Sequence, residues 1–175
     1  MPVKDLKGES MKPQLTLVVA VAAAAVAVLA TPVIAGGVAN SATGSGHLTA
    51  DGGYRTFSFS AREYADGSVK GQAQLNNRGQ ERRIHFTVDC LAVVGNRAYI
   101  SGMSKSASQP ADLGGYWNMA VEDNGQGASS PPDRVTRAFQ LTPAPSSQWR
   151  CDNPAVQALM TGQLLPVERG NVQVR

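Results

Sequence analysis

Charge, aromatic side chains and cysteine are all scarce in this chain, and each scarcity excludes a class of protein. Charged residues make up 17% of the 175 positions and the formal net charge is +3, which is too little for a disordered polyelectrolyte or a dedicated nucleic-acid binder. Aromatic residues, at 6%, are too few for the girdles of an outer-membrane barrel. Two cysteines cannot build a cystine-dense miniprotein or a four-cysteine zinc site.

The N-terminal segment, residues 1–35, has the pattern of a secretory signal peptide. Lys4, Lys7 and Lys12 precede an uncharged stretch over residues 15–29, and small residues around Ala35 fit a cleavage site. The alternative is an uncleaved anchor, because the apolar stretch reaches the roughly 20 residues that a bilayer requires if it continues to Val38. Both interpretations predict an extracytoplasmic protein, secreted or associated with the cell envelope. Contact with a membrane is expected only through this segment, if it is retained.

Cys90 and Cys151 are expected to form a disulfide, because exported proteins fold in an oxidising compartment. The alternatives are two free buried thiols, or a metal pair that lacks its other ligands.

Most of the remaining chain alternates between apolar and polar residues, which is the signal of half-buried strands. The alternation is clear in residues 55–61, 69–75 and 84–90, and it places Cys90 on the apolar face together with Ile84 and Phe86. Further strands are expected at 97–103, 116–122, 137–141 and 171–174, and a short helix at 154–160. Short turns between neighbouring strands imply antiparallel pairing.

These elements predict an all-β domain over residues 47–175, preceded by a flexible lead-in at residues 36–46 that is rich in small and polar residues. The expected fold is an antiparallel meander of about seven to eight strands. The sequence leaves open whether the meander closes as a small barrel or as a two-sheet sandwich.

A series of short motifs runs through residues 44–175 in a fixed order. The series comprises Gly46-His47, Phe57-Ser58-Phe59-Ser60-Ala61, Asp66-Gly67-Ser68-Val69-Lys70-Gly71-Gln72, Val88-Asp89-Cys90-Leu91, Gly95-Asn96, Asp123-Asn124-Gly125-Gln126-Gly127, Pro131-Pro132-Asp133 and Gly170-Asn171-Val172. It resembles a secreted bacterial all-β domain family that occurs alone or after choice-of-anchor modules in exported proteins of high-G+C bacteria. The resemblance implies export and a β fold. It supplies no activity, cofactor or catalytic residue, and Gln126 departs from its pattern where an acidic residue is expected.

Four residues are candidates for ligand binding. Tyr116, Trp117 and Trp149 have rings that can stack on a sugar or an apolar ligand, and His85 has a polar group on the solvent-facing side of its strand. The alternatives are core packing for Trp117 and an ordinary surface position for His85.

A calcium site is a further candidate, at Glu122, Asp123, Asn124 and Asp133, because calcium is held by oxygen ligands on bent loops. The alternative is a structural turn, since Asn-Gly is a common hairpin signal. No other cofactor is expected.

Three functions are compatible with these observations. The preferred hypothesis is an exported, non-catalytic β-domain that binds or packs at the cell envelope or outside the cell, with an envelope component or a small apolar or glycan ligand as partner. The second is a small-ligand carrier with a lipocalin-like pocket. The third is a secreted hydrolase that uses His47 or His85 with an acid, although no Gly-x-Ser-x-Gly nucleophile motif in a strand-to-helix context occurs. The arginines at 78, 82 and 83 are expected to lie on a solvated turn; the alternative is that they attract an anionic envelope polymer. Nucleic acid is not expected as a partner.

Overall fold

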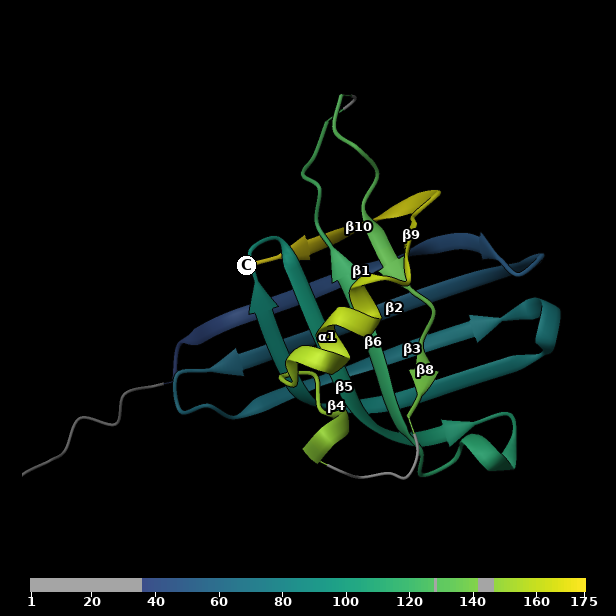
Figure 1. Ribbon diagram of the computed structural model, residues 1–175, viewed down its shortest axis with the longest axis horizontal. Coiled ribbons are helices and arrows are strands. Elements are labelled where there is room, and N and C mark those ends of the chain that lie inside the picture. The colour runs from purple at the N-terminus through teal and green to yellow at the C-terminus, as the bar shows by residue number, and fades with distance from the viewer. Residues whose placement is uncertain (1–35, 128, 142–146) are drawn as a thin grey trace, which may run out of the picture. The chain divides into compact units, whose positions relative to one another are not determined.

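The computed structural model describes residues 36–127, 129–141 and 147–175, so the expected signal peptide lies outside the described residues (Figure 1). The strands of the described part are β1 (Val38–Ala50), β2 (Gly53–Tyr64), β3 (Val69–Asn77), β4 (Arg82–Val94), β5 (Arg97–Ala107), β6 (Tyr116–Glu122), β7 (Arg134–Thr136), β8 (Phe139–Gln140), β9 (Leu164–Pro166) and β10 (Arg169–Val174). Its helices are α1 (Pro154–Thr161) and the short 3-10 helices η1 (Arg78–Gln80), η2 (Pro110–Asp112) and η3 (Ser147–Trp149).

All ten strands belong to one antiparallel sheet, in the order β10-β1-β2-β3-β4-β5-β6-β7-β9, with β8 paired to β6. The sheet curls into a barrel-like half shell (Figure 1). The prediction of an all-β antiparallel meander is therefore confirmed, with ten strands instead of seven or eight. The short helix expected at 154–160 is also present, as α1. No helix in the described part of the chain is long and apolar enough to span a membrane.

The concave face of the sheet holds the main core. Its largest fully buried side chains include Trp117, Phe86, Ile100 and Met119. Val135 of β7 and Val172 of the edge strand β10 join the same cluster, so strands far apart in the sheet order share one core. The interior of the shell is thus filled by side chains.

A second, smaller core lies on the other face, where α1 packs against β6 (Figure 1). It contains Val156 and Met160 of the helix, together with the disulfide between Cys90 and Cys151, whose Cα atoms are 5.9 Å apart. The expected disulfide is confirmed. Because strand β6 lies between the two cores, all seven of its residues are buried.

The expectation that Cys90 shares a face with Ile84 and Phe86 is wrong. Between Val88 and Cys90 the pairing with β5 shifts by one residue, since Val88 lies opposite Gly102 and Cys90 opposite Ser101. This β-bulge reverses the alternation of side chains, as an inserted residue must. Cys90 therefore points to the helix side of the sheet, where it reaches Cys151.

The expectation of a flexible lead-in at residues 36–46 is also wrong, because most of this segment forms β1. This strand pairs with β2 on one side and with β10 on the other. Its small residues serve close packing: a Cβ atom added to Gly44 would lie 2.8 Å from the carbonyl oxygen of Asn171 and from the ring of Phe59. The small side chains therefore reflect the crowding of neighbouring strands.

Candidate functional site

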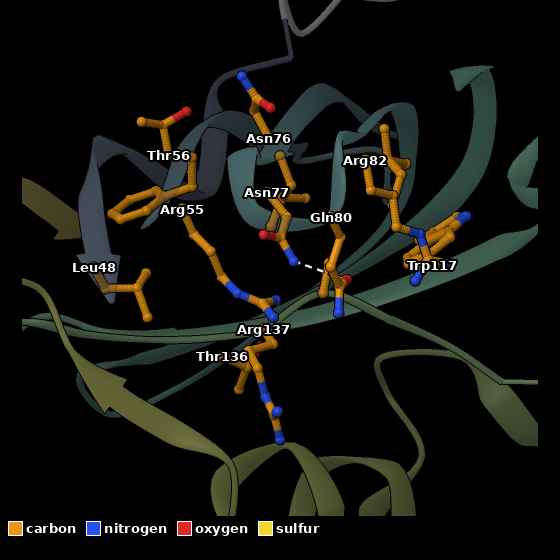
Figure 2. Close-up of a pocket in the computed structure, with 14 residues that line it drawn as sticks. Leu48, Arg55, Thr56, Asn76, Asn77, Gln80, Arg82, Trp117, Thr136 and Arg137 are labelled. Atoms are coloured by element: carbon orange, nitrogen blue, oxygen red, sulfur yellow. Dashed lines mark hydrogen bonds between the residues drawn. The ribbon is translucent and has the colours of Figure 1, made fainter. Parts of the chain in front are cut away.

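A cleft opens at the end of the shell where β2 begins, β3 ends and β4 begins. Its volume is about 40 Å³. The lining includes the apolar side chains of Leu48, Phe57, Leu75, Ile84, Trp117 and Ala138, and three arginines, Arg55, Arg82 and Arg137. We call this site the arginine cleft (Figure 2).

Arg55 and Arg137 both line the cleft and share one carboxylate, that of Asp51. The Arg55 Nη2 atom is 2.8 Å from Asp51 Oδ2, and the Arg137 Nη1 atom is 2.6 Å from the same oxygen. Burial lowers the pKa of Arg55 from its ordinary value, Asp51 opposes that shift, and the positive charge of Arg137 adds to it. The pair therefore concentrates positive charge in a place that is partly shielded from water.

Arg82 supplies the third guanidinium group, held by a bidentate pair with Asp112. Its Nε and Nη2 atoms donate to the two carboxylate oxygens at 2.7 and 2.5 Å, and this bond raises the pKa of Arg82. The same guanidinium group lies over the ring of Trp117, 5.0 Å from the ring centre. Trp117 is therefore both a core residue and one side of the cleft.

The net charge of the cleft and its ion pairs is +1. Three guanidinium groups, of Arg55, Arg82 and Arg137, are paired with only two carboxylates, those of Asp51 and Asp112. Within the described residues, two buried polar atoms of the lining have no hydrogen-bond partner: the donor Arg55 Nε and the acceptor Asn77 Oδ1. A buried donor without a partner is costly, by about 1–3 kcal/mol. A cleft with net positive charge and an unpaired N–H group is chemically suited to an anion.

The four residues predicted to bind ligand do not form one site. Trp117 lines the arginine cleft. Tyr116 is buried on the opposite face, where its hydroxyl donates to Asp89 and contacts Ser101, and burial raises its pKa to about 12. Trp149 packs against the small core around the disulfide. His85 borders a separate pocket on the outer surface of β2 and β3.

The histidines considered for a hydrolase are both placed outside the arginine cleft. His47 lies 3.9 Å from a carboxylate oxygen of Glu168, and its ring is tilted against that of Tyr54, with ring centres 4.9 Å apart. His85 lies opposite Gln74 in the register of β3 and β4.

The four residues of the calcium candidate do gather in space, but their oxygens are engaged with the chain itself. Asp133 accepts from the backbone N–H groups of Asn124 and Val172 at 2.9 and 2.7 Å, and Asp123 accepts from Val174 at 3.0 Å. Glu122 accepts from Arg97 Nε. Among the residues described, no group of three or more His, Cys, Asp or Glu side chains is arranged to hold a metal ion.

Sequence reasoning missed the arginines of the cleft, although the alternation contained a signal for two of them. Arg55 precedes Phe57 by two positions, and Arg82 precedes Ile84 by two positions, so each arginine points to the same face as the apolar residue. The expectation that Arg82 lies on a solvated turn with Arg78 and Arg83 is wrong. In the structure it points inward to Trp117, whereas Arg78 and Arg83 border an outer groove.

Comparison with known proteins gives no match to a family model, to a curated protein or to a solved structure.

Proposed function

We propose that this domain is an exported, non-catalytic binding module, acting at the cell envelope or outside the cell, and that its ligand binds in the arginine cleft. The observation that carries the proposal is the cleft itself, whose lining includes three arginines and Trp117, with Arg82 over the Trp117 ring. The disulfide supports the extracytoplasmic part of the proposal, because disulfides persist in oxidising compartments.

The carrier hypothesis, by contrast, requires an internal cavity. The concave face of the sheet is filled by Trp117, Phe86 and Met119, each at most 1% exposed. A ligand therefore fits at the end of the shell, with only part of its surface enclosed. The resemblance to exported bacterial β-domains agrees with this proposal without adding a ligand.

Native mass spectrometry of the protein purified from its own host tests the proposal. We expect a bound small molecule or a cell-envelope fragment that is lost in Arg137→Gln, because that change removes one guanidinium group from the cleft. Arg62→Gln is the matched control, since Arg62 is an exposed arginine of β2 outside the cleft. An adduct that survives Arg137→Gln, or reproducible turnover in a broad hydrolase panel, would contradict the proposal.

A further inference from the structure

We propose that the arginine cleft recognises a carboxylate group carried on an apolar body, and that Asp51 is an internal competitor which the ligand displaces. The inference rests on the proposed function and names the chemical class of its ligand.

Asp51 already shows how the cleft holds a carboxylate. Its oxygens accept from Arg55 and Arg137 at 2.6 to 2.8 Å, the distance of charge-assisted hydrogen bonds. The residue reaches these groups from the rim, because it belongs to the tight turn between β1 and β2, where Asp51 and Gly52 both have positive φ. The cleft is therefore already arranged to bind a carboxylate, and the carboxylate it holds is that of Asp51 at its rim.

The contact to Asp51 is exchangeable. The side chain of Asp51 is 49% exposed, and water screens ion pairs of such groups so that they contribute little to stability. Arg82, in contrast, is held by Asp112, whose side chain is only 4% exposed. An incoming carboxylate can thus take the place of Asp51 while Asp112 keeps Arg82 over Trp117.

A ligand carboxylate on an apolar body gains contacts that Asp51 does not make. It can accept from the buried Nε–H group of Arg55, which has no partner within the described residues. Its body can contact the apolar lining, to which Leu48, Phe57 and Trp117 belong. A monocarboxylate also restores the charge that Asp51 takes away when it turns to solvent, so the exchange leaves the charge of the cleft unchanged.

The size of the cleft agrees with this chemistry. A volume of about 40 Å³ holds roughly three water-sized groups, which is the space of a carboxylate and the atom next to it. The apolar body then extends from this space along the apolar lining towards the open side of the cleft.

Calorimetric titration of the purified protein with matched probes tests the inference. Benzoate and hexanoate should bind, and benzamide, the neutral isostere of benzoate, should bind at least about tenfold more weakly. Arg137→Gln should weaken benzoate binding by about tenfold or more, while Arg62→Gln leaves it unchanged.

Substitution of Asp51 distinguishes two roles for this residue: competing with the ligand for the arginines, or holding the arginines in position. Asp51→Asn keeps a residue that tolerates positive φ but removes the competing charge, so benzoate should bind about two- to fivefold more tightly. Asp66→Asn, in the turn between β2 and β3, is the matched control and should have no effect. Weaker binding in Asp51→Asn would show that Asp51 only positions the arginines, and would overturn the competitor role.

Three further results would overturn the ligand class. These are equal binding of benzamide and benzoate, tighter binding of inorganic phosphate or glucuronate than of benzoate, and no binding by any carboxylate. If an adduct from the host depends on Arg137 but carboxylates do not bind, the proposed function stands and this inference fails. If carboxylates bind as expected but the host protein carries no Arg137-dependent adduct, the proposed function fails instead.

Discussion

The buried carboxylate of Glu122 is paired with arginines, and its environment shows how burial and charge compete at a single residue. Its side chain is 7% exposed, at the end of β6, and Arg97 Nε donates to it at 2.5 Å. Burial by itself would raise the pKa of Glu122, but the hydrogen bonds from Arg97 and Asn124 and the charges of Arg97 and Arg134 outweigh burial and lower it. The ionised form is therefore the one that the fold stabilises.

This pKa shift makes stability depend on pH in a known direction. Because the pKa of Glu122 is lowered in the folded state, its contribution is fully present above the unfolded pKa, about 4.3, and is lost as pH falls through the lower folded value. We expect Glu122→Gln to destabilise the protein at pH 7 by about 1–3 kcal/mol and to reduce the loss of stability below pH 4.3. Urea unfolding at pH 7 and pH 3 measures both effects.

Glu81→Gln is the control, because Glu81 is exposed in the hairpin between β3 and β4. A Glu122→Gln variant that loses as much stability as the unmodified protein between these two pH values would refute the linkage.

At the scale of elements, the edge strand β10 is covered by side chains. One row of its backbone groups pairs with β1. On the other side, the N–H group of Val172 donates to Asp133 and that of Val174 donates to Asp123, both from the connection between β6 and β7. Carboxylates thus take the place of the carbonyl groups of a neighbouring strand, and they cover an edge that could pair with another chain.

Asp133 should accordingly be costly to replace. Asp133→Ala leaves the N–H groups of Val172 and Asn124 without their acceptor, and we expect a loss of about 2–4 kcal/mol in the free energy of unfolding. Asp133→Asn keeps one acceptor oxygen and should lose less. Hydrogen exchange of the Val172 amide should become faster in both variants.

Asp152→Ala, at an exposed aspartate, provides the baseline for these measurements. A loss below about 1 kcal/mol in Asp133→Ala would mean that the carboxylate does not hold β10 in place.

The strands could be predicted from the sequence wherever one face is apolar and the other polar. Residues 69–75 alternate in the sequence and lie in β3. The alternation did not predict the bulge at Asp89, because a bulge leaves no sign in the pattern of apolar and polar residues. It also did not predict β1, because close packing there requires small residues, and a segment rich in small residues resembles a flexible linker. The arginine cleft escaped prediction mainly because the partner of Arg82 is Asp112, thirty positions away in a loop without periodicity.

At the scale of the whole domain, the disulfide closes the smaller core by tying the segment before α1 to the sheet. It links β4 to the segment just before α1, over 61 positions of sequence. The backbone N–H group of Cys151 also donates to Ser101 Oγ on β5 at 3.2 Å, so the segment is anchored beside the sheet. The helix packs on the outer face of the strands whose inner face carries Trp117.

Removal of the disulfide should therefore destabilise the domain as a whole. Loop-closure entropy for this separation corresponds to about 4 kcal/mol, and we expect a loss of that order in the double variant Cys90→Ala with Cys151→Ala. Chemical denaturation with and without reductant measures it, since reductant should affect the unmodified protein and not the double variant. Equal stability of the two proteins under oxidising conditions would contradict this role.

Nuclear magnetic resonance mapping of the purified protein during titration with benzoate tests most directly where this domain binds. The account predicts that the shifted signals are those of the side chains of Arg55, Arg82 and Arg137 and of the Trp117 indole. Shifts confined to the outer face around His85 or Trp149, or no shifts at millimolar benzoate, would contradict it.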